Sequence, residues 1–121
     1  MFSISMKACC LVVVLMFSRE SSCTKSSGFE GLGADKVVKA ELIYDKVMDE
    51  VGHVDDFDSR GDACDRLTAE FNRQLARSDG KWMCIWSGPG GVVSVRRLAL
   101  IRWDRPAPGG NETFVMIVPT H

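Results

Sequence analysis

The sequence is poor in histidine, the residue that enzymes most often use for acid–base chemistry. Its 121 residues include two histidines, His53 and His121, and a single tyrosine. His53 follows an expected helix and stands beside acidic residues, which favours a surface or capping role. No serine lies in the sharply turned setting that a serine–histidine–aspartate site requires. We therefore expect no catalytic residues, no cofactor and no enzymatic activity.

The sequence also lacks a strong charge of one sign. Fifteen Lys and Arg residues against sixteen Asp and Glu residues give a formal net charge of −1. Nucleic-acid-binding proteins usually gather an excess of basic residues on one face. Local basic groups such as Arg96, Arg97 and Arg102 are few, and they fit a solvated strand face better. We expect no nucleic-acid partner.

Metal-binding motifs are absent as well. The chain has neither a CxxC pair nor a Cys/His quartet with zinc-site spacing. The segment Val54–Asp62 superficially resembles a calcium loop, but Arg60 and Leu67 stand where such a loop needs oxygen ligands. We expect no metal ion, and instead a turn whose acidic residues cap and charge the start of the next helix.

No long apolar run spans a bilayer. The run Ala8–Phe17 is too short, because a spanning helix needs about 20 apolar residues. Preceded by Lys7 and followed by the small and polar Ser18–Cys23, it has the layout of a secretory signal. Residues 1–23 are interpreted as signal-like or, alternatively, as a disordered N-terminal segment. The tripeptide Asn111–Thr113 (NET) is a glycosylation acceptor by pattern, usable only in a secreted chain.

The expected state of the cysteines depends on whether the chain is secreted. Of five cysteines, three lie within residues 1–23, so removing this segment leaves Cys64 and Cys84. In an oxidising compartment this pair could form a disulfide. In the cytosol the two residues would be small buried apolar side chains.

Two amphipathic helices are predicted in the first half of the remaining chain. Thr24–Asp35 is rich in Ser and Gly and is interpreted as a flexible linker. Apolar residues then recur every three or four positions from Lys36 to Val51, which predicts a helix closed by Gly52. The same periodicity predicts a second helix over about Asp62–Ala76.

Three strands are predicted in the second half. Lys81–Ser87 alternates bulky residues on both faces, which suggests a strand inside a sheet or an interface. After a glycine-rich turn, Val92–Trp103 is the second strand, and Glu112–Pro119 is the last. Asp104–Asn111, with two prolines and two glycines, is interpreted as a loop. Helices segregated from antiparallel strands predict an α+β domain over residues 36–121.

Short motifs in this order resemble those of the small dynein light chains, a family of peptide-binding adaptors. Glu70–Phe71, near the end of the second helix, matches the family's EF[DN], and Trp82–Ile85 matches W-x-C-I. Gly91–Val93 stands in place of the glycine-led strand that follows in the family. The resemblance covers residues 36–121, with Met83 where the family has histidine and valines where it has serine and tyrosine.

The resemblance implies a homodimer that binds extended peptide segments of partner proteins, such as dynein intermediate chains. Such a protein belongs to a microtubule motor complex or serves other partners as a hub, in the cytoplasm and on the cytoskeleton. The implied peptide-binding strand contains Gly90, Gly91, Val92, Val93, Ser94 and Val95. The expected dimer interface contains Trp82, Met83, Cys84, Ile85 and Trp86. The alternative is a small secreted extracellular binding protein stapled by a Cys64–Cys84 disulfide.

Overall fold

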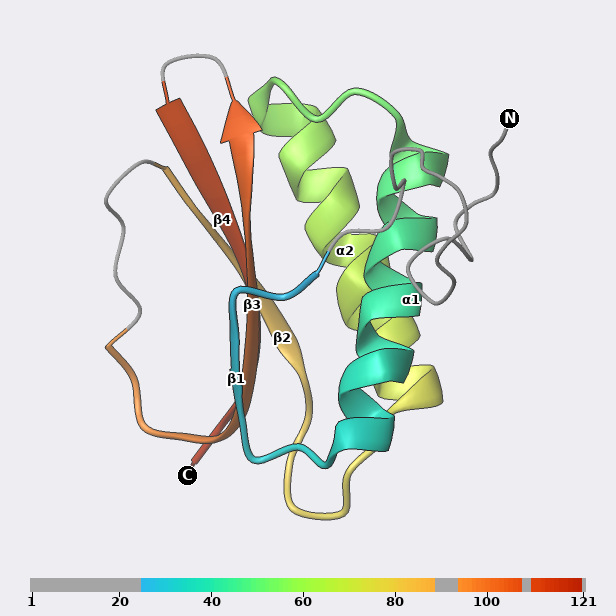
Figure 1. The fold of residues 1–121 in the computed structure, drawn as a ribbon, viewed down its shortest axis with the longest axis vertical. Coiled ribbons are helices and arrows are strands. Elements are labelled where there is room, and N and C mark those ends of the chain that lie inside the picture. Colours follow the sequence, from blue (N-terminus) through green and yellow to red (C-terminus); the bar gives the residue numbers. More distant parts are fainter. Residues whose placement is uncertain (1–24, 89–93, 108–109, 121) are drawn as a thin grey trace, which may run out of the picture.

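The fold consists of two helices packed on a four-stranded antiparallel sheet (Figure 1). The computed structural model describes residues 25–88, 94–107 and 110–120. The elements in chain order are β1 (Gly28–Glu30), α1 (Ala34–Val51), α2 (Phe57–Gln74), β2 (Met83–Ser87), β3 (Arg97–Ala107) and β4 (Gly110–Pro119). This arrangement confirms the predicted α+β class.

Helix α1 forms because its apolar side chains share one stripe that faces the sheet. Val37, Ala40, Ile43, Tyr44 and Val47 are buried at helical spacing. The helix ends at Gly52, whose φ of 81° lies in the left-handed region that favours glycine. The predicted helix at Lys36 to Val51 is therefore correct, with two further residues at its start.

Helix α2 begins earlier than the sequence suggested. The Asp56 carboxylate accepts a hydrogen bond from the Ser59 amide at 2.8 Å, and the Ser59 hydroxyl accepts one from the Asp56 amide at 3.2 Å. This capping box stabilises a helix that starts at Phe57. The prediction of a turn through Val54–Asp62 is therefore wrong from Phe57 onwards, where the residues belong to α2.

The sheet has the order β1-β3-β4-β2, and every neighbouring pair is antiparallel. The predicted flexible linker at Thr24–Asp35 is wrong over Gly28–Glu30, because these residues pair with β3 as strand β1. The predicted loop Asp104–Asn111 is also wrong, since β3 and β4 remain paired as far as Ala107 and Gly110. Pro106 is tolerated there because β1 reaches only to Arg102, which leaves β3 with one neighbour.

Aromatic side chains join the helices to the inner face of the sheet. The ring of Tyr44 on α1 stacks on that of Trp103 on β3, with centroids 4.2 Å apart. Phe71 on α2 packs edge-on against Trp82 at 5.1 Å. The outer face carries a second, smaller cluster of Leu100, Val115 and Ile117, with Ile85 packed against it. Within the described residues, neither helix is long and apolar enough to cross a membrane.

Candidate functional site

Strand β2 lies at one edge of the sheet. It pairs with β4 from Met83, opposite Ile117, to Ser87, opposite Thr113. Among the described residues no strand pairs with its other side, because β2 is last in the strand order. An unpaired edge presents backbone donors and acceptors to which another strand can bind.

The main chain just before β2 shows which backbone groups face outward. The side-chain carbonyl of Asn72 on α2 accepts a hydrogen bond from the Trp82 amide at 2.9 Å, and its NH₂ group donates to the Trp82 carbonyl at 3.1 Å. Both backbone groups of Trp82 therefore bind α2. In an extended chain every second residue presents its N–H and C=O on the same side. We infer that Cys84 and Trp86 also direct theirs away from β4.

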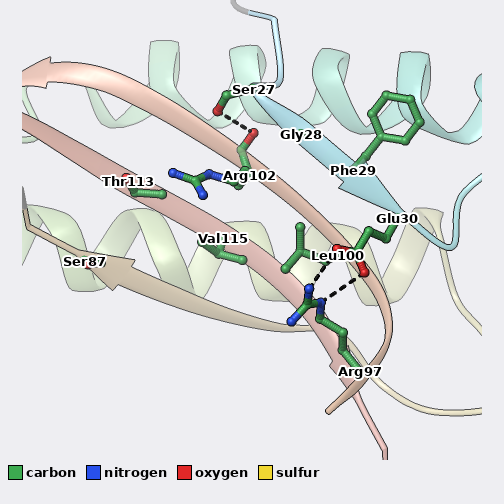
Figure 2. A pocket seen from close by; sticks show the side chains of 10 residues that line it. All are labelled: Ser27, Gly28, Phe29, Glu30, Ser87, Arg97, Leu100, Arg102, Thr113 and Val115. Carbon is green, nitrogen blue, oxygen red and sulfur yellow. Dashed lines mark hydrogen bonds and ion pairs between the residues drawn. The ribbon is translucent and has the colours of Figure 1, made fainter. Parts of the chain in front are cut away.

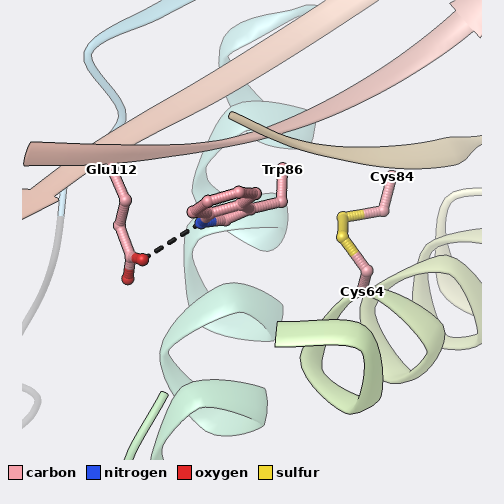
Figure 3. Close-up of a disulfide and its surroundings, with 4 residues drawn as sticks. All are labelled: Cys64, Cys84, Trp86 and Glu112. Carbon is pink, nitrogen blue, oxygen red and sulfur yellow. Dashed lines mark hydrogen bonds between the residues drawn. A yellow bond between two sulfur atoms is a disulfide. The ribbon is translucent and has the colours of Figure 1, made fainter. Parts of the chain in front are cut away.

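Helix α2 runs beside β2 in the opposite direction and holds it at three levels. The Arg60 guanidinium lies 4.5 Å from the ring centroid of Trp86. Cys64 and Cys84 form a disulfide, with their Cα atoms 5.3 Å apart (Figure 3). Asn72 binds Trp82 at the third level. These contacts fix the helix and the edge strand to each other, so a strand that binds this edge meets a preformed partner.

A polar stripe of α2 lies on the side that Asn72 identifies. Gly61, Asp65, Thr68 and Asn72 follow one another at spacings of four, three and four residues, which places them on one face of the helix. Gly61 has open space around its Cα, and Asp65 is exposed. The Asn72 contact with Trp82 places this face beside β2. A partner strand on the edge would therefore meet small and acidic side chains on α2.

An ionic cluster around a buried glutamate orients the C-terminal end of β2, at Trp86. Glu112 on β4 is only 1% exposed, and its two oxygens lie 3.2 Å from the Arg60 Nε and 3.3 Å from the Arg105 Nε. The indole N–H of Trp86 donates to the same carboxylate at 3.0 Å (Figure 3). A buried carboxylate requires such partners. The cluster therefore fixes the ring of Trp86, which is 36% exposed at the edge.

The tyrosine nearby is not suited to acid–base chemistry at neutral pH. Tyr44 is buried in the core, and burial is the largest cause that raises the pKa of its phenol to about 12, while Arg105 acts in the opposite direction. The phenol therefore stays protonated. The described residues also hold no group of three or more His, Cys, Asp or Glu side chains that could bind a metal ion.

The structure separates the residues of the predicted dimer interface. Trp82 lies in the core at 2% exposure, and its indole N–H donates to the Leu75 carbonyl at 2.8 Å. Its side chain therefore offers no surface to a second copy. Cys84 is in the disulfide. Met83 (43% exposed) and Trp86 are exposed, and Cys84 and Ile85 are partly buried.

The predicted peptide-binding strand is mostly outside the described residues. Gly90, Gly91, Val92 and Val93 all lie outside the described residues. Ser94 and Val95 are described and exposed, and they lie before β3 rather than in a strand.

Two residues of the site were missed by sequence reasoning. Asn72 directly follows the Glu70–Phe71 motif, but a polar residue on an amphipathic helix gives no sign that it binds a strand. Glu112 was considered only as the first residue of the last strand and as the middle residue of a glycosylation pattern. A single carboxylate at the start of an apolar strand was the signal that could have identified it.

A shallow pocket of about 360 Å³ lies on the sheet face opposite the helices (Figure 2). Its two arginines are engaged by carboxylates of the same chain: Arg97 binds Glu30 at 2.7 Å, and Arg102 binds Asp104 at 3.0 Å. The contact with Arg97 lowers the pKa of the Glu30 carboxyl. The floor is apolar, from Leu100 and Val115. This combination indicates no particular ligand, so the edge of β2 remains the stronger candidate.

Comparison of this chain with protein-family models, with curated proteins and with solved structures found no match.

Proposed function

We propose that this protein is a non-enzymatic, dimeric adaptor that binds extended peptide segments by β-strand addition. One observation carries the proposal: β2 is an edge strand whose outer side has no partner among the described residues. Backbone groups of Cys84 and Trp86 then pair with the edge of a second copy, and an extended peptide is added next to it by the same kind of backbone contact, with neighbouring side chains supplying selectivity.

The rigid support of β2 favours this role over a passive edge. Sheet edges in monomeric proteins are usually blunted by charges, prolines or bulges. The five residues of β2, MCIWS, include none of these. The disulfide and the Asn72 contact keep the strand extended against α2, which lowers the entropy that binding must overcome.

The two predicted strands have different roles in this proposal. A second copy pairs at β2, where Met83, Ile85 and Trp86 are partly exposed. The segment Gly90–Val95 then receives the peptide, in line with the resemblance to small dynein light chains. The order of helices and strands supports that comparison. Dynein intermediate-chain-like segments and a microtubule motor complex are the partners that it suggests, in the cytoplasm.

A second candidate function is that of a small secreted binding protein, and the disulfide favours it. Cys64 and Cys84 are paired, and such bonds persist in oxidising compartments. Strand addition and secretion are compatible, since the described fold has both the unpaired edge of β2 and the disulfide. The redox state of the two cysteines in the native protein decides between the cytoplasmic and the secreted proposals.

The test of strand addition uses a peptide selected from a random library on the full chain. Backbone amides are followed by hydrogen exchange with and without this peptide. We expect the amides of β2, including those of Cys84 and Trp86, to exchange more slowly in the dimer than in the monomer. Amides within Gly90–Val95 should exchange more slowly once the peptide is added. Protection confined to other surfaces in both cases would refute the proposal.

A matched pair of variants isolates the backbone contribution. Trp86→Pro removes the N–H that faces outward, whereas Trp86→Phe keeps it and, like the proline, loses the indole bond to Glu112. We expect the proline variant to weaken self-association much more than the phenylalanine variant. Equal weakening would show that the side chain, not the strand edge, makes the contact.

A further inference from the structure

The tripeptide Asn111–Thr113 lies at the start of β4, at the hairpin end of the sheet. Asn111 is exposed, whereas Glu112 faces the helices and is buried. Because side chains alternate along a strand, Asn111 faces the opposite side, away from the helices. Asn111 pairs across the ladder with Pro106, and no residue of β2 pairs with β4 beyond Thr113. A group attached to the Asn111 side chain would therefore project outward and leave the paired part of β2 free.

The disulfide is an independent observation on the compartment in which this chain folds. Cys64 on α2 is bonded to Cys84 on β2. The remaining cysteines all lie within residues 1–23, so the described domain has no unpaired cysteine. Such pairing is typical of proteins that fold in an oxidising compartment, which in eukaryotic cells also holds the glycosylation machinery.

From these two observations we propose that Asn111 is a site of N-linked glycosylation, modified during passage through the secretory pathway. The Asn111 side-chain nitrogen attacks C1 of a lipid-linked oligosaccharide diphosphate. A C–N bond forms, the bond from C1 to the diphosphate oxygen breaks, the lipid diphosphate leaves and the amide loses one proton. This inference depends on the secreted candidate and not on strand addition.

The folded sequon also limits when the transfer takes place. The Thr113 hydroxyl donates to the Asp104 carboxylate at 2.6 Å, and Thr113 is 8% exposed. Glu112 is held between Arg60 and Arg105. An enzyme that must bind all three residues of the acceptor would have to pull β4 out of the centre of the sheet. Transfer therefore precedes the pairing of β4, and the finished fold tolerates the glycan because Asn111 is exposed.

The experiment expresses the full chain, with its own N-terminus, in cultured eukaryotic cells. The protein is digested with peptide N-glycosidase, and its mobility and mass are compared before and after. We expect a glycosidase-sensitive shift in the parent chain. The shift should persist in Thr113→Ser, which keeps the acceptor pattern, and vanish in Asn111→Gln and Thr113→Val.

The outcomes separate the parts of the proposal. A secreted chain with the Cys64–Cys84 bond and no glycan overturns the site alone. A cytosolic chain with free thiols overturns the secretory route as well. Neither result affects strand addition, for which Asn111→Gln should bind the selected peptide as the parent does. Slower folding in the Cys64→Ala/Cys84→Ala variant should raise the glycosylated fraction, and an unchanged fraction would contradict the proposed timing.

Discussion

The side chain of Asn72 makes the two hydrogen bonds to the main chain of Trp82 that a neighbouring strand would make. A helix thereby closes the sheet edge at one residue and leaves it open at the next two outward-facing positions. The carboxamide suits this role because it holds a donor and an acceptor in the geometry of a peptide group.

The first prediction concerns this contact. Asn72→Ala should lower the free energy of unfolding by about 1–3 kcal/mol, because the two polar groups of Trp82 lose their partner in a partly buried site. Asn72→Asp keeps the acceptor and loses the donor, and we expect an intermediate loss. Urea unfolding measures both. Equal stability of all three proteins would show that solvent replaces Asn72 without cost.

The disulfide should contribute by restricting the unfolded chain. Cys64 and Cys84 are separated by 20 residues, a loop length for which the loss on removal is about 3 kcal/mol. We expect the Cys64→Ala/Cys84→Ala variant to melt at a lower temperature and to be insensitive to reductant. The parent should approach the variant when dithiothreitol is added. A parent melting curve that does not change on reduction would contradict this.

The ionic cluster at Glu112 should be far more sensitive than the exposed pairs. Glu112→Gln leaves Arg60 and Arg105 without their buried counter-charge, and we expect a loss of about 3–5 kcal/mol. Glu30→Gln removes an exposed partner of Arg97 and should cost much less, because solvent screens this surface pair. Chemical unfolding of both variants provides the comparison. Similar losses at the two positions would mean that the cluster is solvated.

Self-association should depend on the exposed side chains of β2. Met83→Lys places a charge at the sheet edge, where it opposes pairing with another strand, and should shift a dimer towards monomer. Leu42→Lys is the control, because Leu42 is an exposed apolar residue on α1 away from the edge. Sedimentation equilibrium measures the effect. A parent that is monomeric at micromolar concentration would exclude the dimer before either variant is tested.

Acid should destabilise the fold in part through Asp104. The hydrogen bond from Thr113, and next the bond from Arg102, lower the pKa of this carboxyl in the folded state. A lowered pKa adds stability above the unfolded value, near 3.9, and this stability is lost as the pH falls through the folded value. We expect Asp104→Asn to lose less stability than the parent between about pH 6 and pH 2. Identical pH profiles from urea unfolding would contradict this.

Local periodicity explains which parts of the fold were predictable from sequence. Two patterns can be recognised within one continuous segment each, and the structure has both. One is the apolar stripe of α1, and the other is the alternation of Cys84 and Trp86 with Met83 and Ile85 in β2. Strand β1 is three residues long, too short for any period, and is held by its pairing with β3. Pro106 and the neighbouring glycines suggested a loop, but pairing across the hairpin outweighs that local preference.

The candidate site was less predictable because an edge is a property of the strand order. The sequence indicates that Met83–Ser87 forms a strand, and only the assembled sheet makes β2 its outer strand. The contacts of Asn72 and Glu112 likewise join residues from different elements: Asn72 lies ten positions before Trp82, and Glu112 lies 52 positions after Arg60. No spacing rule within one element gives such pairs.

The position of β4 in the sheet determines what happens to the fold when this strand is removed. β4 ends at Pro119 and lies between β2 and β3, so the last described strand is an inner strand of the sheet. A chain cut before Gly110 would lose the strand that joins β2 to the rest, leaving β1 paired with β3 and β2 with no paired strand among the described residues. We expect the domain to unfold as a unit when β4 is removed, whereas loss of a terminal segment that is not tied down leaves most domains folded.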